Sequence, residues 1–155
     1  MKTDFVQSGG FLTIDTPFGA NDLLLDGLEG SEGISELFKF NLFMRSGSTS
    51  LSATTIVGKT ATITMEVEGG SKRYIHGIVS RFIQSGYDVD FATYQAELVP
   101  SLWLLTLSRD RKIYQTKSIL DIVKAVLGDA SITFSDKTSG TYTGMAIPGM
   151  RYWRS

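Results

Sequence analysis

The sequence contains no cysteine at all. This absence excludes a disulfide framework, a thiol nucleophile and a zinc ion held by cysteine, and it suits a protein made in the cytoplasm. A chain of 155 residues can still bury about 70% of the surface that its unfolded form exposes. We therefore expect a folded core that needs neither a metal nor a disulfide for its stability.

Long apolar runs are missing as well. The first residues, Met1-Lys2-Thr3-Asp4-Phe5, lack the apolar centre of a signal peptide, and no segment approaches the roughly 18 apolar residues of a membrane span. We therefore expect neither export by the general secretory route nor direct insertion of this chain into a membrane.

The net charge is only −1, but the charges are unevenly distributed along the chain. Residues 1–36 hold seven acids and one base, whereas residues 37–155 hold nine acids and fourteen bases. Two interpretations stay open: contacts between unlike edges of neighbouring copies, or opposite charges on different solvated faces. Because Arg109, Arg111 and Lys112 form the only basic run, nucleic acid is not an expected partner.

Histidine is nearly absent too, since His76 is the only one. A Ser/His/Asp triad would have to be built around this residue, but no motif of the kind that exposes a serine nucleophile is present. His76 falls within a predicted strand, so we interpret it as a half-buried strand histidine.

Two glycine patterns resemble nucleotide-binding motifs only in part. Gly58-Lys59-Thr60 matches the end of a phosphate loop whose first glycine would fall at position 53, where the chain has Ala53. Glycines at positions 27, 30 and 33 repeat every third residue and precede no predicted helix, unlike a dinucleotide fingerprint. We interpret them as bends in a β-rich segment.

The remaining candidates for chemistry are acidic and aromatic. Asp88 and Asp90 have the first spacing of a calcium loop, but Ala92 stands where a third oxygen ligand belongs. Trp103 lies among leucines, where an aromatic ring fits a core or a subunit contact better than a ligand platform. The sequence therefore predicts no catalytic, cofactor-binding or metal-binding residue, no cofactor, and a protein that is not an enzyme.

Strand patterns dominate the first hundred residues. The clearest is Thr60–Glu68, where apolar and polar residues alternate, as they do in a half-buried antiparallel strand. Gly69-Gly70-Ser71 predicts a hairpin turn after it. The other predicted strands are Phe11–Asp15, Leu23–Leu28, Phe38–Arg45, Arg73–Gln84 and Thr93–Val99. The predicted core positions are Ile63, Met65, Val67, Ile78, Tyr94 and Leu98.

The order of these elements predicts the fold class. Six strands at short spacing, with no crossover helix before residue 100, favour a mainly β fold: an antiparallel β-barrel or a strongly curved sheet. One helix follows, capped by Ser118, with Asp121 in its first turn and Gly128 at its end. Its predicted buried stripe is Ile119, Ile122, Val123, Val126 and Leu127.

The rest of the second half is less patterned. Pro100–Ser108 is apolar and ambiguous between helix and strand. Ser131–Ser135 is a plausible strand, and residues 138–144 are rich in Gly, Thr and Ser.

Three stretches carry more specific patterns. Residues 29–40 read EGSEGISELFKF, residues 73–82 read RYIHGIVSRF, and residues 98–115 read LVPSLWLLTLSRDRKIYQ, followed by the predicted helix. The first stretch resembles the early strand pair of the VgrG spike proteins of type VI secretion, the second resembles the RYxHGIV strand of that family, and the third resembles the segment that precedes its helix. Their order and spacing agree over residues 1 to about 130.

The resemblance implies a role as well as a fold. It implies the first barrel of a hub similar to the baseplate hub of contractile phage tails, part of a homotrimer that docks on the hexameric tube protein Hcp. In that family, effectors and a tip protein attach through a C-terminal part. The chain would be made in the cytoplasm and then secreted through the type VI apparatus, helping to puncture a target and deliver effectors.

The final residues depart from the family. After the helix the chain reads YTGMAIPGMRYWRS over residues 142–155, where related proteins continue into the rest of the hub. We therefore expect residues 1–115 to form the barrel, and residues 116–155 to form a helix and the start of a connection to a missing second part. A truncated fragment would account for this end, whether it was shortened deliberately or comes from a truncated gene, and so would a frameshift that makes the last residues foreign to the family.

Two alternatives to the secretion spike are open at this point. One is a baseplate hub of a contractile phage tail or tailocin, since fold alone does not decide function. The other, from a different class, is a carbohydrate-binding or hydrolase module on a β-barrel. Such a module would need a convergent polar cleft, which the sequence does not indicate.

Overall fold

A computed structural model describes residues 6, 7, 9–109, 111–135 and 137. The chain forms two compact units, Met1–Pro100 and Ser101–Ser155. The first contains all the strands of the described residues, and the second contains the helix that follows them.

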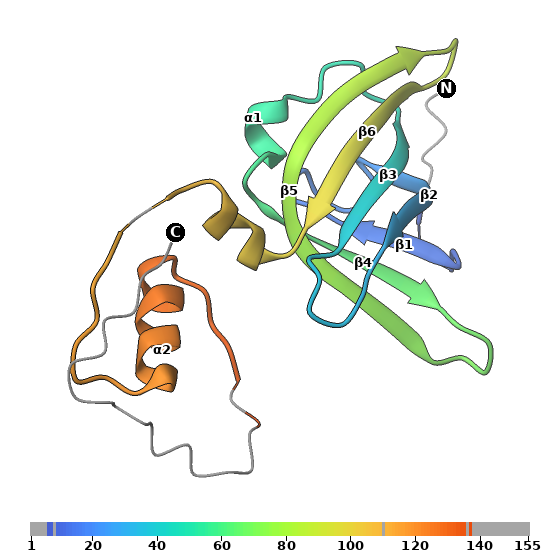
Figure 1. Cartoon of the computed structure of the whole chain (residues 1–155). Coiled ribbons are helices and arrows are strands. Elements are labelled where there is room, and N and C mark those ends of the chain that lie inside the picture. Colours follow the sequence, from blue (N-terminus) through green and yellow to red (C-terminus); the bar gives the residue numbers. More distant parts are fainter. Residues whose placement is uncertain (1–5, 8, 110, 136, 138–155) are drawn as a thin grey trace. The chain divides into compact units, whose positions relative to one another are not determined.

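The first unit is a single six-stranded antiparallel sheet that curls into a half-barrel (Figure 1). Its order is β1-β4-β5-β6-β3-β2, so β1 and β2 lie at the two ends of the sheet, and curling brings these two strands into contact. The bounds are β1 Leu12–Asp15, β2 Leu24–Ser31, β3 Lys39–Ser46, β4 Thr60–Glu66, β5 Lys72–Tyr87 and β6 Ala92–Val99. The predicted fold class and the six predicted strands are confirmed.

The core lies on the inner face of this sheet. Burial alternates strictly along β3, where Phe40, Leu42 and Met44 are buried and the residues between them are exposed. Each fully buried aliphatic or aromatic side chain contributes about 1.5–3 kcal/mol relative to an exposed one. Phe82 and Tyr94 stack in the core with their ring centroids 5.1 Å apart.

Most of the predicted core positions are correct. Ile63, Tyr94 and Leu98 are fully buried in the main cluster, and Met65 packs against it while partly exposed. Ile78 is also buried, opposite Val99 on β6 and outside that cluster. Val67 is 42% exposed, so this prediction is wrong: β4 ends at Glu66, and Val67 already belongs to the turn.

The predicted turn between β4 and β5 is confirmed. Gly69 and Gly70 have φ angles of 92° and 79°, a conformation that a side chain disfavours. The amide of Val67 donates to Ser71 O at 2.8 Å, closing the hairpin.

The long strand β5 is shaped by a close approach and by bulges. A Cβ atom on Gly77 would lie 2.5 Å from Val99 O and 3.0 Å from Leu98 Cγ. Strand β6 therefore packs so closely against Gly77 that a larger residue would not fit without a shift. Register shifts between Val79 and Arg81 and between Gln84 and Gly86 mark two bulges. Bulges bend a strand and increase its twist, which lets 16 residues follow the curl of the sheet.

A short helix was missed by the sequence analysis. Helix α1, Ala53–Ile56, is a single turn between β3 and β4 that Ser52 caps, and it places Ile56 in the core. Its four residues are too few to show a helical period. The preceding loop is held by Tyr94, whose hydroxyl donates to Ser48 O at 2.9 Å and accepts from Leu51 N at 3.4 Å.

A side chain, not a strand ladder, joins β1 to the start of β2. The Gln7 amide accepts from Ile14 N at 2.7 Å and donates to Leu23 O at 2.6 Å. It also donates to Ile14 O at 3.3 Å. One glutamine thus satisfies backbone groups on both sides of the seam between the ends of the sheet.

The second unit is mainly helical within its described residues. Ser101–Thr106 form a 3-10 helix, η1, which resolves the ambiguity of Pro100–Ser108. Helix α2, Ile119–Asp129, begins as predicted: Ser118 Oγ accepts from Asp121 N at 3.1 Å. No helix of the described residues is both long and apolar enough to cross a membrane.

Three predictions about this unit differ from the structure: the end of the helix, the strand after it and the buried stripe of the helix. Helix α2 continues past Gly128 and ends at Asp129, with Ala130 as its C-cap and Ser131 at a φ of 56°. No strand forms at residues 131–135. The predicted buried stripe of α2 has no fully buried member, and its Ile119 and Val123 are exposed. Residues 138–144 lie outside the described part of the chain.

Candidate interaction surface

The outward face of the sheet presents two rows of side chains across neighbouring strands. Register places Arg81 on β5 beside Glu97 on β6, then Asn41 on β3, then Glu29 on β2. The adjacent row runs from Ile83 through Gln95 to Phe43. We call the β5-β6-β3 part of these rows the outer face; its members are Asn41, Phe43, Arg81, Ile83, Gln95 and Glu97.

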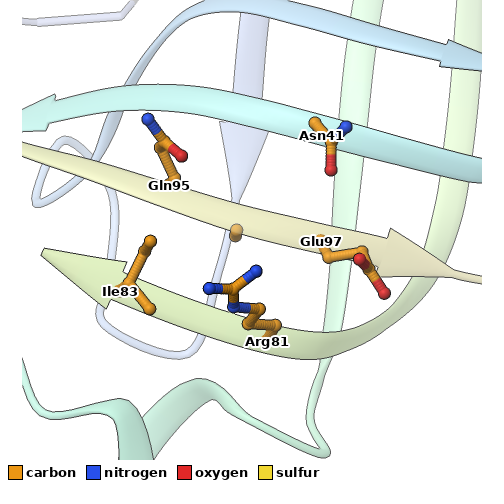
Figure 2. A pocket seen from close by; sticks show the side chains of 6 residues that line it. Asn41, Arg81, Ile83, Gln95 and Glu97 are labelled. Atoms are coloured by element: carbon orange, nitrogen blue, oxygen red, sulfur yellow. The ribbon is translucent and has the colours of Figure 1, made fainter. Parts of the chain in front are cut away.

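A shallow hollow lies in the middle of the outer face (Figure 2). Figure 2 shows labelled side chains from three neighbouring strands around it. Its volume is about 40 Å³, whereas pockets for small molecules enclose roughly 300–1,000 Å³. The hollow is therefore a surface feature of the sheet and not an enclosed ligand pocket.

Glu97 is the charged centre of this surface. Its carboxylate lies 2.5 Å from Lys39 Nζ and accepts a hydrogen bond from Ser80 Oγ at 2.7 Å. The hydrogen bond from Lys39 is the main reason that the pKa of Glu97 lies below its ordinary value, with Ser80 and the Arg81 charge adding to the effect against the opposing cost of burial. The carboxylate is thus held ionised at neutral pH.

Other polar groups of the outer face are uncommitted. Within the described residues, the side chains of Arg81, Asn41 and Gln95 form no hydrogen bond or ion pair. Beside them Phe43 and Ile83 are 39% and 36% exposed. Apolar side chains surrounded by polar groups with free hydrogen-bonding capacity are typical of protein–protein interfaces.

His76 is exposed, not half-buried as predicted. It points outward from β5, and its Nδ1 lies 2.8 Å from Thr62 Oγ1. No carboxylate hydrogen-bonds to it within the described residues, so the arrangement of a triad is not formed around it.

The glycines of the two partial nucleotide-binding motifs lie in a strand of the sheet and in turns beside its strands. Gly58, with a φ of 77°, follows helix α1 and precedes strand β4, which is the reverse of the strand–loop–helix order of a phosphate loop. Gly27 lies at a bulge in β2, and Gly30 lies in β2 opposite Phe40. Gly33 accepts from the amide of Glu36 in the turn after β2.

The remaining candidate residues for metal or ligand binding do not gather into a site within the described residues. Asp88 and Asp90 lie in the β5–β6 turn, where Asp88 Oδ1 accepts from the amide of Val89 at 2.7 Å. Among the described residues, no three His, Cys, Asp or Glu side chains gather into a group that could hold a metal. Trp103 lies half-buried in η1. That the chain has no catalytic or metal site stays a prediction.

Sequence reasoning missed the outer face. Arg81, Asn41 and Gln95 belong to no motif, and the sequence gives no sign that they are neighbours. The available signal was alternation, because residues between buried positions of a strand point outward. The order β5-β6-β3 that assembles them depends on pairing between distant segments.

Comparisons with known proteins place this sheet in a family. A family model described as phage tail baseplate hub (GPD) matches residues 31–146. The type VI secretion system spike protein VgrG1c of Pseudomonas aeruginosa is 38% identical over 139 residues, which are 89% of this chain and 19% of that protein. VgrG1a of the same organism is 39% identical over 131 residues, or 84% of this chain and 20% of that protein.

A solved structure has the same fold. The E. coli c3393 protein, described as a type VI secretion component similar to the T4 phage tail proteins gp27 and gp5, matches with a TM-score of 0.57 and 24% identity. The match covers 68% of this chain and 31% of that one.

The chain spans about a fifth of the length of the curated spike proteins that it matches. With the hub model covering most of its residues, this chain belongs to the phage tail baseplate hub family and resembles the VgrG spike proteins within it.

Proposed function

We propose that this chain is a structural element of a type VI secretion spike, forming part of the hub on which the spike is built. The observation that carries the proposal is the hub-family match over residues 31–146, which includes strands β3, β4, β5 and β6 of the curled sheet. The 38% and 39% identity to secretion spike proteins favours a spike over the baseplate hub of a phage tail or tailocin.

The finer parts of the proposal concern assembly. The hub is a homotrimer, it docks on the hexameric tube protein Hcp, and it leaves the cell through the apparatus together with the effectors. Effectors and the tip are carried by other parts of the longer spike. The chain acts by surface complementarity and not by catalysis, and the shallowness of its hollow supports this. The same proposal divides the chain into a barrel at residues 1–115 and a connection at residues 116–155.

Assembly on the tube tests this function. Purified chain is mixed with Hcp from the same organism, and complexes are examined by sedimentation and by electron microscopy of tube ends. We expect concentration-dependent trimers that bind tube ends, with a Kd in the micromolar range, about −8 kcal/mol. A chain that binds no tube end at any concentration contradicts the proposal. A screen for glycan binding and ester hydrolysis is the control for the alternative class.

A further inference from the structure

The turn between β5 and β6 exposes two large apolar side chains. Tyr87, the last residue of β5, is 81% exposed, and Val89 within the turn is 95% exposed. Val89 lies between two exposed acids, Asp88 and Asp90. We call residues 87–91 the tip. Exposed apolar area that is bordered by charged groups is a feature of protein interaction sites.

The tip is held in one conformation by hydrogen bonds and by the strands below it. The amide of Asp88 donates to Phe91 O at 2.7 Å, and Asp88 Oδ1 accepts from the amide of Val89 at 2.7 Å. Below the turn, Tyr87 is paired with Ala92 of β6, which is also paired with Ser46 of β3. Because the tip is ordered before any partner binds, docking costs it less conformational entropy.

Arg45 of β3 also ties the tip to the sheet. Its guanidinium group lies 5.6 Å from the centre of the Phe91 ring and forms an ion pair with Asp26 of β2 at 2.7 Å. Phe91 is therefore engaged with the sheet and is only partly exposed. Tyr87 and Val89 remain as the exposed apolar groups of the tip.

The position of the tip defines the side from which a partner approaches. Strand β6 begins beside the tip at Ala92 and ends at Val99, where the chain leaves the sheet (Figure 1). The β2–β3 turn lies at the Val99 end too, since Phe40 is paired with Leu98. A partner of the tip therefore meets the end of the sheet opposite to that at which the chain continues.

The side chains of the tip specify the chemistry of such a partner. Tyr87 and Val89 fit an apolar pocket, and a tyrosine ring is among the side chains that contribute most to protein interfaces. Asp88 and Asp90 would lose hydration at the rim of that pocket, so lysine or arginine must face them. The anionic surface of a membrane would repel the same two acids, which favours a protein over a lipid surface.

We propose that the tip docks on a partner protein, with Tyr87 and Val89 inserted into an apolar pocket that lysine or arginine residues border. The inference rests on the proposed function, in which this partner is the tube protein, and it specifies the part of the hub that meets the tube.

Substitutions in the tip of the full chain test this contact. Binding to Hcp from the same organism is measured by sedimentation for the wild type, Tyr87→Ala, Val89→Ser and the double variant. Each single substitution should weaken binding by about tenfold, and the double variant by about a hundredfold. Raising the salt concentration should weaken binding by the wild type, and should weaken it less in Asp90→Asn.

Ile34→Ser is the matched control. Ile34 is 99% exposed in the β2–β3 turn, so its substitution removes an equally exposed apolar side chain from the other end of the sheet. Binding by this variant should stay within about threefold of the wild type. Circular dichroism should show an intact sheet in all variants, and the wild type should not bind vesicles of anionic phospholipid.

The outcomes separate this inference from the proposed function. If the wild type binds the tube protein and the double variant binds it equally well, the tip contact is wrong while the hub proposal stands. A loss in Ile34→Ser equal to that in Val89→Ser also overturns the contact, because exposed apolar area at either end would then have the same effect. Vesicle binding that the double variant loses would assign the tip to a membrane instead. A wild type that binds no tube protein overturns both proposals.

Discussion

The two units of the chain bury their apolar side chains to very different extents. In Met1–Pro100 a continuous cluster lines the inner face of the sheet, and several of its side chains, including Leu42, Ile63 and Leu98, are fully buried. In the described part of Ser101–Ser155 only Tyr114 is buried, and Ile119 and Val123 of helix α2 are exposed.

The difference reflects how each unit is built. The sheet joins segments that are distant in the sequence, such as β3 with β6 and β1 with β4. The apolar side chains of each strand therefore become exposed when its partner strands unfold. Helix α2 depends on local features such as its serine cap, and none of its residues is fully buried, so it lacks the packing from which most helix stability comes. Stability should therefore be concentrated in the sheet, and the following predictions test that contrast.

The largest contrast should come from deleting core methyl groups. Leu42→Ala should lower the free energy of unfolding by about 2–5 kcal/mol, because it leaves a cavity among fully buried neighbours. Val123→Ala, on the partly exposed helix, should cost less than about 1 kcal/mol. Urea unfolding followed by circular dichroism checks both variants, and equal losses would show that the second unit has a core of its own.

A smaller effect should come from filling the close approach at Gly77. Gly77→Ala places a Cβ 2.5 Å from Val99 O, so β5 and β6 must shift, at a cost of about 1–3 kcal/mol. Gly27→Ala is the matched control in the same sheet, since no atom lies within 4 Å of its Cβ, and its stability should stay within about 1 kcal/mol of the wild type. Thermal unfolding of the pair measures the difference.

The helix should respond locally to the loss of its cap. Ser118→Ala should cost helix α2 about 1 kcal/mol, and Ser118→Asp should preserve its stability because aspartate also caps. Both tryptophans, 103 and 153, belong to the second unit, so their fluorescence reports on it while amide exchange of β-strand residues reports on the sheet. Changed amide exchange throughout the sheet in Ser118→Ala would show that the effect of the cap is not confined to the helix.

The smallest effect should come from the outer face. Because the folded pKa of Glu97 lies below its unfolded value, the stability that its carboxylate contributes is present above the unfolded pKa and is lost as pH falls through the folded pKa. For a pair at the surface this contribution is at most about 1 kcal/mol. Urea midpoints at pH 7 and pH 3 should therefore differ less in Glu97→Gln and in Lys39→Met than in the wild type. An unchanged difference in both variants contradicts the assigned cause.

The sheet could be predicted because alternation appears in the sequence itself. Thr60–Glu66 alternates apolar and polar residues, and Phe40, Leu42 and Met44 fall at every second position of Lys39–Ser46. The Gly69-Gly70 turn fixes the pairing of β4 with β5. The same logic failed at residues 131–135. Ile132 and Phe134 alternate with polar residues there, but no strand pairs with them within the described chain, and a strand without a partner has unsatisfied backbone groups.

The interaction surface could not be predicted, since it depends on strand order. Arg81, Glu97 and Asn41 are far apart in the sequence and become neighbours only through the order β5-β6-β3. The bulge between Val79 and Arg81 also shifts which residues of β5 face outward. By contrast, the local cap at Ser118 is readable directly from the sequence.

The Gln7 side chain joins the two ends of the sheet, so the half-barrel can open along this seam. A strand ladder opens by breaking many hydrogen bonds together, whereas a single side chain leaves its site by rotating about its own bonds, on a timescale of picoseconds to nanoseconds when solvent reaches it. The amide of Ile14 points to Gln7 and not to β4, so its proton is protected only while the glutamine stays in place. Exchange at Ile14 should therefore be faster than at the central strands β5 and β6, and should report the parting of the two ends of the sheet while every strand pair is still intact.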